Sequence, residues 1–303
     1  MPPVGSPIPS PKNEQPLLLW LVKVLDPMKR TRVKQVLQHA RVLVNGTIVT
    51  RHDHPVGPQD ALVLMPEGTL PPPEWTASPD QPPGRVSKAP FPVLYSDLDL
   101  LVVDKPSGLL SVANGAFKNN TAFSKLFDWL NTQKAGRPFV VHRLDRETSG
   151  LMVFARTADA RDALQHNWEE VRKTYLAICE GCPPSPEGEI ETLVEEGKDL
   201  KVRVVRDPGP DARRSLTTYK VLSRHGNHSL LELGLLTGRK HQIRVHLAHI
   251  GCPVAGDGQY GATTDLCGRI ALHSWRISFP HPVTGQLIEM ESPLPDDLKR
   301  ALA

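Results

Sequence analysis

Charged side chains that could do acid–base or ion-pair chemistry are concentrated in the stretch VVHRLDRETSGLMVFAR, residues 140–156. An aspartate, Asp145, lies between two arginines, and apolar runs flank the charged residues at 139–141 and 151–154. Such runs predict buried strands, and Ser149-Gly150 between them suits a turn. We therefore expect Asp145 on a loop held by two strands, where an ionised carboxylate could stabilise positive charge or act as a nucleophile.

Basic residues are concentrated in a second stretch, LLTGRKHQIRVHLAHIGCPVAGDGQYG, at 235–261. Six of the eight positions 239–246 are basic or polar: Arg239, Lys240, His241, Gln242, Arg244 and His246. The alternation in HQIRVHL predicts a strand with one apolar and one polar face. The apolar set is Ile243, Val245 and Leu247, and the polar set is Arg244 and His246. A basic face of this kind is either a solvated edge or the lining of a cleft.

The elements that must position these residues follow from the rest of the chain. Residues 1–15 are rich in proline, with serine and asparagine among the others, and predict a disordered terminus. Residues 16–65 predict a compact module: an apolar helix (LLLWLVKVL), a basic helix running into a strand, and a hairpin turn at Asn45-Gly46. Residues 66–92 are dense in proline and predict a stiff linker. Strands and short helices alternate irregularly over 93–303, which predicts a mixed α+β domain.

Composition limits the class of protein. The net charge is +3, which permits a nucleic-acid partner without requiring one. Four cysteines are too few for a disulfide-stapled secreted scaffold. The sequence lacks an apolar run long enough to span a membrane, and its start lacks the order of a signal peptide. We expect a soluble, cytoplasmic protein without membrane contact.

Two cofactor-like motifs carry little weight. GDGQYG at 256–261 matches G-x-G-x-x-G, but neither a following helix nor a Rossmann unit accompanies it. Cys179 and Cys182 form a C-x-x-C pair, and the other cysteines do not form a second close pair. We therefore expect no metal, nucleotide or redox cofactor. Ser149 with His142 and Asp145 also lacks the G-x-S-x-G elbow of a serine hydrolase.

Several ordered motifs resemble the RluA-type pseudouridine synthases over about Val93 to Leu294. HRLDRETSGL resembles the family's signature around its catalytic aspartate, and RKTYLA at 172–177 resembles the segment with its active-site tyrosine. The segment TGRKHQIRVHLAHIGCPVAGDGQYG resembles a third motif, with Lys240 in place of the more usual threonine. ALHSWRISFPHPVTG resembles the closing strand pair. The resemblance implies a mixed, largely antiparallel sheet with a central cleft.

The resemblance also implies roles. Asp145 would be the catalytic carboxylate, with Arg244 as its cation and Tyr175 stacked on an extruded uracil. Arg143 would fill the gap left in the RNA. The other residues expected around the substrate are His142, Thr148, Arg239, His241 and Gln242. From the residues alone, Asp145 could instead be a surface ion-pair residue, Tyr175 a core tyrosine and His142 a hydrogen-bonded structural histidine.

The N-terminal module is similar to an S4 RNA-binding domain, although Ala40-Arg41 stands where a glycine is usual. By this resemblance, the basic helix would contact phosphates through Lys29, Arg30, Arg32 and Lys34. The expected substrate is ribosomal RNA, with tRNA as the alternative, and the enzyme would act as a monomer. An ordinary solvated charged face is the alternative for the helix.

Two other functions remain open at this point. An N-glycosidase would hydrolyse the same bond, but retaining hydrolysis usually needs a second carboxylic acid about 5 Å from the first. Glu147 is the nearby candidate in the sequence. A non-catalytic RNA-binding factor would be indicated by loss of Asp145, Tyr175 or Arg244, and all three are present.

Overall fold

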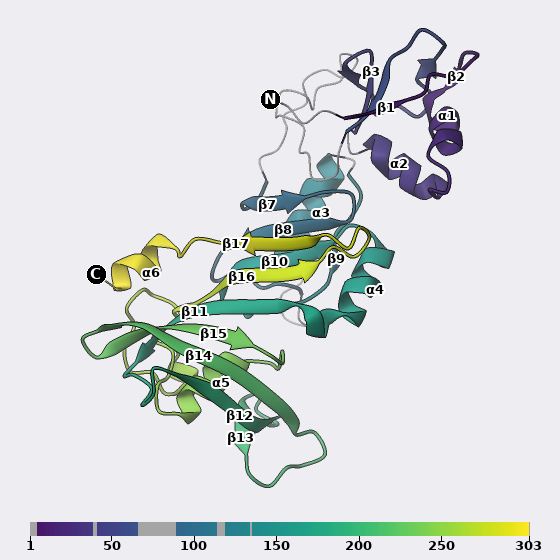
Figure 1. Cartoon of the computed structure of the whole chain (residues 1–303). Helices are drawn as coiled ribbons and strands as arrows, with labels where there is room; N and C mark the ends of the chain where they lie inside the picture. The colour runs from purple at the N-terminus through teal and green to yellow at the C-terminus, as the bar shows by residue number, and fades with distance from the viewer. Residues whose placement is uncertain (1–4, 39–40, 66–88, 114–118, 134, 303) are drawn as a thin grey trace.

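The computed structural model describes residues 5–38, 41–65, 89–113, 119–133 and 135–302 (Figure 1). Within these ranges the chain forms an N-terminal part, residues 5–65, with a four-stranded sheet, and a C-terminal part, residues 89–302, built on an eleven-stranded sheet. Figure 1 shows the N-terminal part beyond the β7 edge of the large sheet. None of the helices in the described ranges has the length and apolar character needed to cross a membrane.

The N-terminal part follows the predicted order of helix, helix, strand and hairpin. Its elements are β1 (Ser6–Ile8), β2 (Gln15–Pro16), α1 (Leu17–Val24), α2 (Arg30–Gln38), β3 (Val42–Val44), β4 (Thr47–Ile48), β5 (Pro55–Val56) and β6 (Leu62–Leu64). Asn45 and Gly46 have φ values of 53° and 79°, as a type I′ hairpin turn requires. The predicted hairpin is therefore confirmed.

The prediction of disorder over residues 1–15 is wrong from residue 5 onward. Strand β1 pairs with β6, and β2 pairs with β5. Trp20 donates from Nε1 to the carbonyl of Pro9 at 2.7 Å. Prolines are compatible with short edge strands because one side of such a strand needs no ladder hydrogen bonds. Residues 1–4, and 66–88 of the predicted linker, lie outside the described residues.

The large sheet confirms the predicted α+β class with mainly antiparallel pairing. Its path is β13-β12-β14-β15-β11-β16-β10-β8-β7, with β17 on β16 and β9 on β10. The strands are β7 (Val93–Ser96), β8 (Leu100–Lys105), β9 (Phe139–Val140), β10 (Ser149–Ala155), β11 (Arg172–Glu180), β12 (Glu187–Glu196), β13 (Val202–Val205), β14 (Arg213–His225), β15 (His228–Leu235), β16 (Leu272–Pro280) and β17 (Leu287–Glu291). Only β10 and β16, among its paired strands in the described ranges, run parallel.

Helices cover both faces of the sheet near β10. The helices are α3 (Ala122–Thr132), α4 (Ala158–His166), α5 (Gln242–His249) and α6 (Asp296–Ala301), with 3-10 turns η2 (Trp168–Glu170) and η3 (Gly258–Tyr260). Met152 and Phe154 of β10 belong to the same core cluster as α3 and α5. Leu151 and Val153, on the other face, belong to the cluster that includes α4. Since both faces are buried, β10 is apolar from Gly150 to Ala155.

Ser149 and Gly150 belong to β10, so the prediction that they form the turn is wrong. They pair with His273 and Ser274 of β16. Gly150 has a φ of +106°, and a Cβ there would lie 2.2 Å from the carbonyl oxygen of Ser274. Glycine is needed at this position because the backbones of β10 and β16 approach too closely to leave room for a side chain.

HQIRVHL is a helix and not the predicted strand, because most of this segment lies in α5. Ile243 and Leu247, four residues apart, pack into the main core, whereas Val245 packs against Val194 and Val202. Two-residue alternation therefore does not describe this segment, since apolar residues are buried on different sides of one helix.

The turn between β7 and β8 joins the two parts of the chain. Leu98 is 1% exposed and belongs to the N-terminal core cluster. Next to it, Asp99 pairs with Arg32 of α2 through both guanidinium amino groups. We call Arg32, Leu98 and Asp99 the joint.

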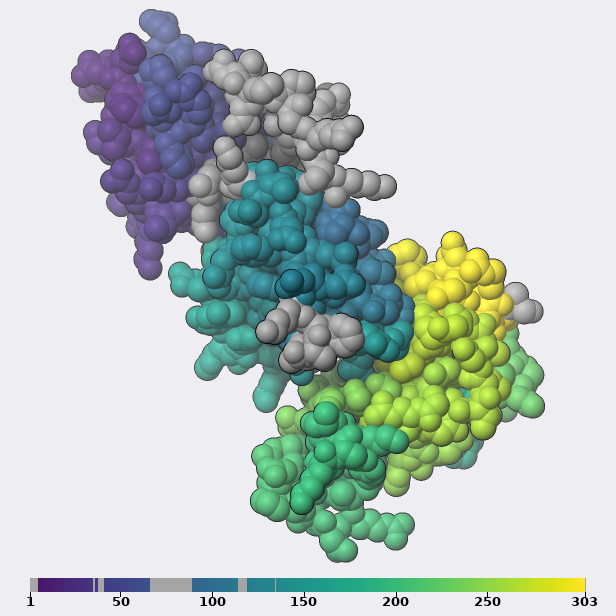
Figure 2. Space-filling model, turned by 180° about the vertical axis from the view of Figure 1, so that it is seen from behind, coloured from purple at the N-terminus to yellow at the C-terminus, as the bar shows by residue number. Residues whose placement is uncertain are grey.

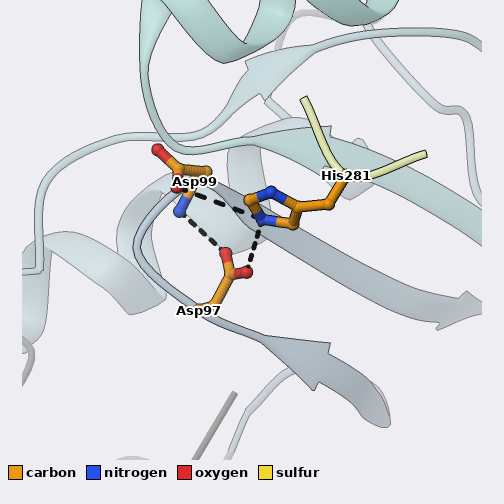
Figure 3. Close-up of side chains that lie close together, drawn as sticks. All are labelled: Asp97, Asp99 and His281. Atoms are coloured by element: carbon orange, nitrogen blue, oxygen red, sulfur yellow. Dashed lines mark hydrogen bonds and ion pairs between the residues drawn. The ribbon is translucent and has the colours of Figure 1, made fainter. Parts of the chain in front are cut away.

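Figure 3 shows Asp97 and His281 next to Asp99 of the joint. Asp97 accepts hydrogen bonds from the backbone N–H groups of Asp99 and Leu100, and its Oδ2 lies 2.8 Å from Nε2 of His281. Asp97, Asp99 and His281 lie close enough for a metal ion, with ligand atoms within 4.8 Å of one another. Their carboxylates already accept these hydrogen bonds and the Arg32 ion pair, so the cluster is explained by its protein contacts.

Candidate active site

A cavity of about 1070 Å³ brings the predicted site residues together. It is lined by the loop between β9 and β10, by the start of α5, by the loop after α5 and by β11. On the face shown in Figure 2, the teal first half of the C-terminal part meets its green second half. All nine predicted residues line it: His142, Arg143, Asp145, Thr148, Tyr175, Arg239, His241, Gln242 and Arg244.

The loop that carries Asp145 is anchored on both sides of the aspartate. Ser111 accepts a hydrogen bond from the N–H of Leu144 and donates one to its carbonyl, at 3.0 and 2.6 Å. The N–H of Thr148 donates to the carbonyl of Asp145 at 3.2 Å. The Asp145 side chain is 29% exposed, so it is fixed in place yet open to the cavity.

Two basic side chains lie near the Asp145 carboxylate. Nη1 of Arg244 is 3.4 Å from Oδ2 of Asp145, and Nε2 of His241 is 4.0 Å from Oδ1. Burial lowers the pKa of His241 in spite of the charge on Asp145. His241 has left-handed backbone, φ 53°, and its Nδ1 lies 2.9 Å from the hydroxyl of Tyr260. This contact orients the imidazole beside the carboxylate.

Arg244 is held by a second aspartate that the sequence analysis did not select. Nε and Nη2 of Arg244 donate to the two oxygens of Asp257 at 2.6 and 2.9 Å. Nη2 also donates to Gln259 at 3.1 Å. Burial disfavours the guanidinium charge, but Asp257 outweighs it and raises the pKa of Arg244. Asp257 lies in the GDGQYG segment, and its acidic side chain next to the basic stretch was the feature of the sequence that could have identified it.

Tyr175 extends the cavity along β11. It is 6% exposed, and burial raises its pKa to about 12, with a smaller contribution from the charge of Asp145. The phenol therefore stays protonated at neutral pH. Its ring is a fixed, uncharged surface near the aspartate, suitable for stacking with a planar ring.

Known proteins match the chain over this same region. The family model for RNA pseudouridylate synthase matches residues 99–249. The uncharacterized RNA pseudouridine synthase YlyB of Bacillus subtilis is 32% identical over 293 residues, which cover 92% of this chain and 90% of the relative. The chain belongs to the RNA pseudouridine synthase family.

Another relative and a solved structure that are similar to this synthase are also named as pseudouridine synthases. Ribosomal large subunit pseudouridine synthase D of Neisseria meningitidis serogroup A is 34% identical, covering 93% of this chain and 76% of the relative. The structure of human RNA Pseudouridylate Synthase Domain Containing 4 has a TM-score of 0.59 and 26% identity, covering 69% of this chain and 91% of that one. The expected pseudouridine synthase fold is thereby confirmed.

A buried lysine of this synthase, Lys105, supports the Asp145 loop and was also missed by the sequence analysis. Its Nζ donates to the carbonyls of Pro106, Leu109 and Arg146 at 2.9, 2.8 and 3.1 Å. Burial lowers its pKa to about 7, against the opposing charges of Glu147 and Asp145. The sequence did offer a sign of this role. Lys105 ends the apolar strand β8, and a lysine that is buried with such a strand needs hydrogen-bond acceptors for its charged group.

His142 has the contacts of a structural histidine in the synthase. Its Nε2 accepts from the N–H of Val153 at 3.0 Å, and its ring stacks on Trp168 with centroids 4.8 Å apart. Burial, together with the charge of Lys173, lowers its pKa to about 3. The imidazole is therefore neutral at physiological pH and carries its proton on Nδ1.

Two predicted ligand contacts are corrected by the structure. The amide of Gln242 accepts from Thr237 and from the N–H of Arg239, and donates to the carbonyl of Leu216 and the hydroxyl of Thr217. Its hydrogen-bonding capacity serves the fold and not a ligand. Arg32 lies in the joint with a side chain only 16% exposed, so it is not on the predicted phosphate-binding face. Lys29, Arg30 and Lys34 remain exposed.

Proposed function

We propose that the chain isomerises uridines in RNA to pseudouridine, with Asp145 as the nucleophile. The observation that carries this proposal is Asp145 in a cavity, 3.4 Å from an Arg244 that Asp257 holds in place. The fixed guanidinium supplies a charge opposite to that of the carboxylate and orients the carboxylate in the cavity. Charge stabilisation by preorganised groups is the largest contribution in many enzymes.

The reaction needs only groups that the chain supplies. Cleavage of the N1–C1′ bond builds positive charge on the sugar, which the Asp145 carboxylate stabilises. The same carboxylate can bond to C1′, in a bond that breaks when C5 attacks that carbon, or it can take a proton from C2′ and return it as C5 attacks. After the uracil turns, C5 bonds to C1′, the hydrogen on C5 leaves as a proton, and N1 gains one. Atoms and electrons balance without an oxidant or a reductant.

Access to the base requires that the uridine leave the stack, which costs a few kcal/mol. Arg143 is exposed on the Asp145 loop and has a planar guanidinium that can stack and bind phosphate. It fills the gap in the RNA in this proposal. Tyr175, held protonated by burial, stacks on the extruded uracil.

Ribosomal RNA is the proposed substrate class, with tRNA as the alternative. A relative aligned over 93% of the chain is a ribosomal large subunit pseudouridine synthase. The N-terminal part acts as an S4-like module in this proposal, and its exposed Lys29, Arg30 and Lys34 contact phosphates. Residues 16–65 and 93–303 are the proposed RNA-binding and catalytic domains.

Hydrolysis by a glycosidase is less well supported. Glu147 accepts a hydrogen bond from Nε of Arg146 at 2.7 Å. A glycosidase acid must reach the leaving group with its carboxyl group, and the carboxyl group of Glu147 is instead paired with Arg146. Two further carboxylates line the cavity: Arg244 occupies both oxygens of Asp257, and Asp265 accepts a hydrogen bond from the backbone N–H of Gly268.

The test uses RNA labelled with tritium at uracil C5, taken from cells that lack this protein. Wild-type protein should release tritium to water, and Asp145→Asn should release at least about a thousandfold less while still binding RNA. Near-normal turnover by Asp145→Asn would exclude Asp145 as the nucleophile. Release of free uracil would favour the glycosidase, and absence of both products would point to a binding protein.

A further inference from the structure

A buried lysine lines the cavity away from Asp145 and has no assigned task. Lys173 of β11 is 9% exposed and lines the cavity. Within the described ranges its Nζ makes neither a hydrogen bond nor an ion pair, and its contact is the ring of Trp168, 5.3 Å from the centroid. A buried ammonium group normally requires hydrogen-bond acceptors or a counter-ion.

In the part of the chain that the structure describes, the surroundings of Lys173 are fixed and contain no acidic partner. Trp168 is stacked on His142, which is itself hydrogen-bonded to β10. Gln165 of α4 donates from Nε2 to the carbonyls of Val140 and Val141, and so ties α4 to the start of the Asp145 loop. Burial lowers the pKa of Lys173, and no carboxylate among the described residues opposes this effect. The ammonium group is thus poised for an anion from outside the protein.

The position of Lys173 identifies that anion. Lys173 and Tyr175 are two residues apart on β11, and both side chains line the cavity, about 7 Å apart along the strand. Tyr175 lies near Asp145, where the uracil and its ribose are held in the proposed function. A lysine one step farther along the same cavity meets the backbone of the RNA and not the reacting base.

We propose that Lys173, positioned by Trp168, binds a phosphate of the RNA strand next to the reacting uridine. This inference rests on the proposed function, because it places the RNA strand relative to Asp145. The contact is sequence-independent, since a phosphate carries no base information. It fixes the strand and thereby the distance from the backbone to the nucleophile.

The test measures the salt dependence of binding, which counts phosphate contacts. The probe is a fluorescent oligouridylate, titrated with wild-type protein and variants between about 50 and 200 mM salt. We expect Lys173→Met to weaken binding about tenfold and to reduce the slope of log affinity against log salt by about 0.7. Lys173→Arg should recover most of the slope.

Arg172 provides the matched control. It is exposed, adjacent to Lys173, and on the opposite face of β11, so Arg172→Met removes the same charge outside the cavity. We expect it to change affinity less than twofold and to leave the slope unaltered. Equal effects of the two substitutions, or no change of slope for Lys173→Met, would overturn the proposal. Failure of the wild type to bind the probe would overturn it too.

Stability separates a ligand site from a structural lysine. If Lys173 binds an anion only when RNA is present, Lys173→Met removes an uncompensated buried charge from the RNA-free protein. The melting temperature of that protein should then stay equal or rise. A fall of several degrees would show that the Trp168 contact stabilises the fold and would contradict the proposal. Tritium release by the wild type tests the proposed function separately, so loss of one result does not imply loss of the other.

Discussion

At the scale of single residues, the site has a rigid ion pair and a looser one that share one guanidinium. Arg244 contacts Asp257 at 2.6 and 2.9 Å but Asp145 at 3.4 Å. Asp257 is 1% exposed, whereas Asp145 opens to the cavity. The two carboxylates therefore differ in freedom: one orients the arginine, and the other is available to react.

Asp257→Asn should separate orientation from charge at Arg244. The asparagine keeps the shape but loses one of the two acceptor oxygens and the negative charge, so Arg244 moves by some fraction of an ångström. We expect turnover to fall about a hundredfold, with little change in RNA affinity, because small displacements of catalytic groups are costly. Tritium release and RNA binding, measured on the same preparation, provide the check.

Gln259→Ala is the companion variant, since it removes one neutral hydrogen bond to Arg244 and leaves Asp257 in place. It should reduce turnover much less than Asp257→Asn does. If Asp257→Asn turned over normally, Arg244 would not depend on Asp257 for its position.

At the scale of elements, α5 is the part that sequence patterns described least well. Every residue from Gln242 to Leu247 is buried, so this part of the helix has no solvent face to create a 3.6-residue pattern. His246 and Gln242 are satisfied by hydroxyls and carbonyls of β14, which no local pattern reveals. By contrast, the Asn45-Gly46 hairpin and the apolar strand β10 were predictable because turn chemistry and burial on both faces are local properties.

Long-range contacts limited the prediction of the site in the same way. Asp145, Tyr175 and Arg244 were selected through family motifs, and they meet in one cavity. Asp257 and Lys105 act through partners whose positions depend on loop geometry. The close pairing of Gly150 with Ser274 joins segments more than a hundred residues apart, and so glycine there was taken for a turn residue.

The attachment of α5 to the sheet should depend on pH through His246. Nδ1 of His246 lies 2.9 Å from the hydroxyl of Thr217, and Nε2 lies 2.8 Å from that of Ser215. Burial, and to a lesser extent His249, lowers the pKa of His246 from 6.5 to about 4. Between those two pH values the unfolded chain binds a proton that the folded chain does not, so the free energy of unfolding falls as pH falls.

Urea unfolding at several pH values from about 7 to about 4 measures this dependence. His246→Gln removes the titrating group, and its free energy of unfolding should fall less steeply over this window than that of the wild type. Other histidines with lowered pKa, such as His142, keep part of the slope in both proteins. Identical slopes would show that His246 binds its proton equally in the folded and unfolded chain.

At the scale of the whole molecule, the joint makes the placement of the N-terminal part a property of the fold. The turn between β7 and β8 contacts the N-terminal part in two ways: Asp99 forms an ion pair with Arg32, and Leu98 packs into the apolar core of that part. Asp99 is 2% exposed in this pair, and burial raises its pKa although Arg32 opposes that effect. Removing one partner of such a pair costs about 3–5 kcal/mol.

Charge reversal tests the joint. Arg32→Glu should lower the melting temperature by several degrees, because it brings a third carboxylate to Asp97 and Asp99. Adding Asp99→Arg should restore at least half of the loss by re-forming the pair in the opposite sense. Arg30→Glu, on the exposed part of α2, is the control and should leave the melting temperature nearly unchanged. A double variant no more stable than Arg32→Glu would contradict a direct interaction.

Leu98 also has a consequence for the order in which the protein is made. The core around α1, α2 and β3 includes this residue, which follows the proline-dense stretch at 66–92 in the chain. During synthesis the N-terminal part therefore reaches its full core only after Leu98 has emerged from the ribosome. A cut in that stretch would separate the core from one of its own side chains, so the apparent boundary in the sequence is not a boundary for folding.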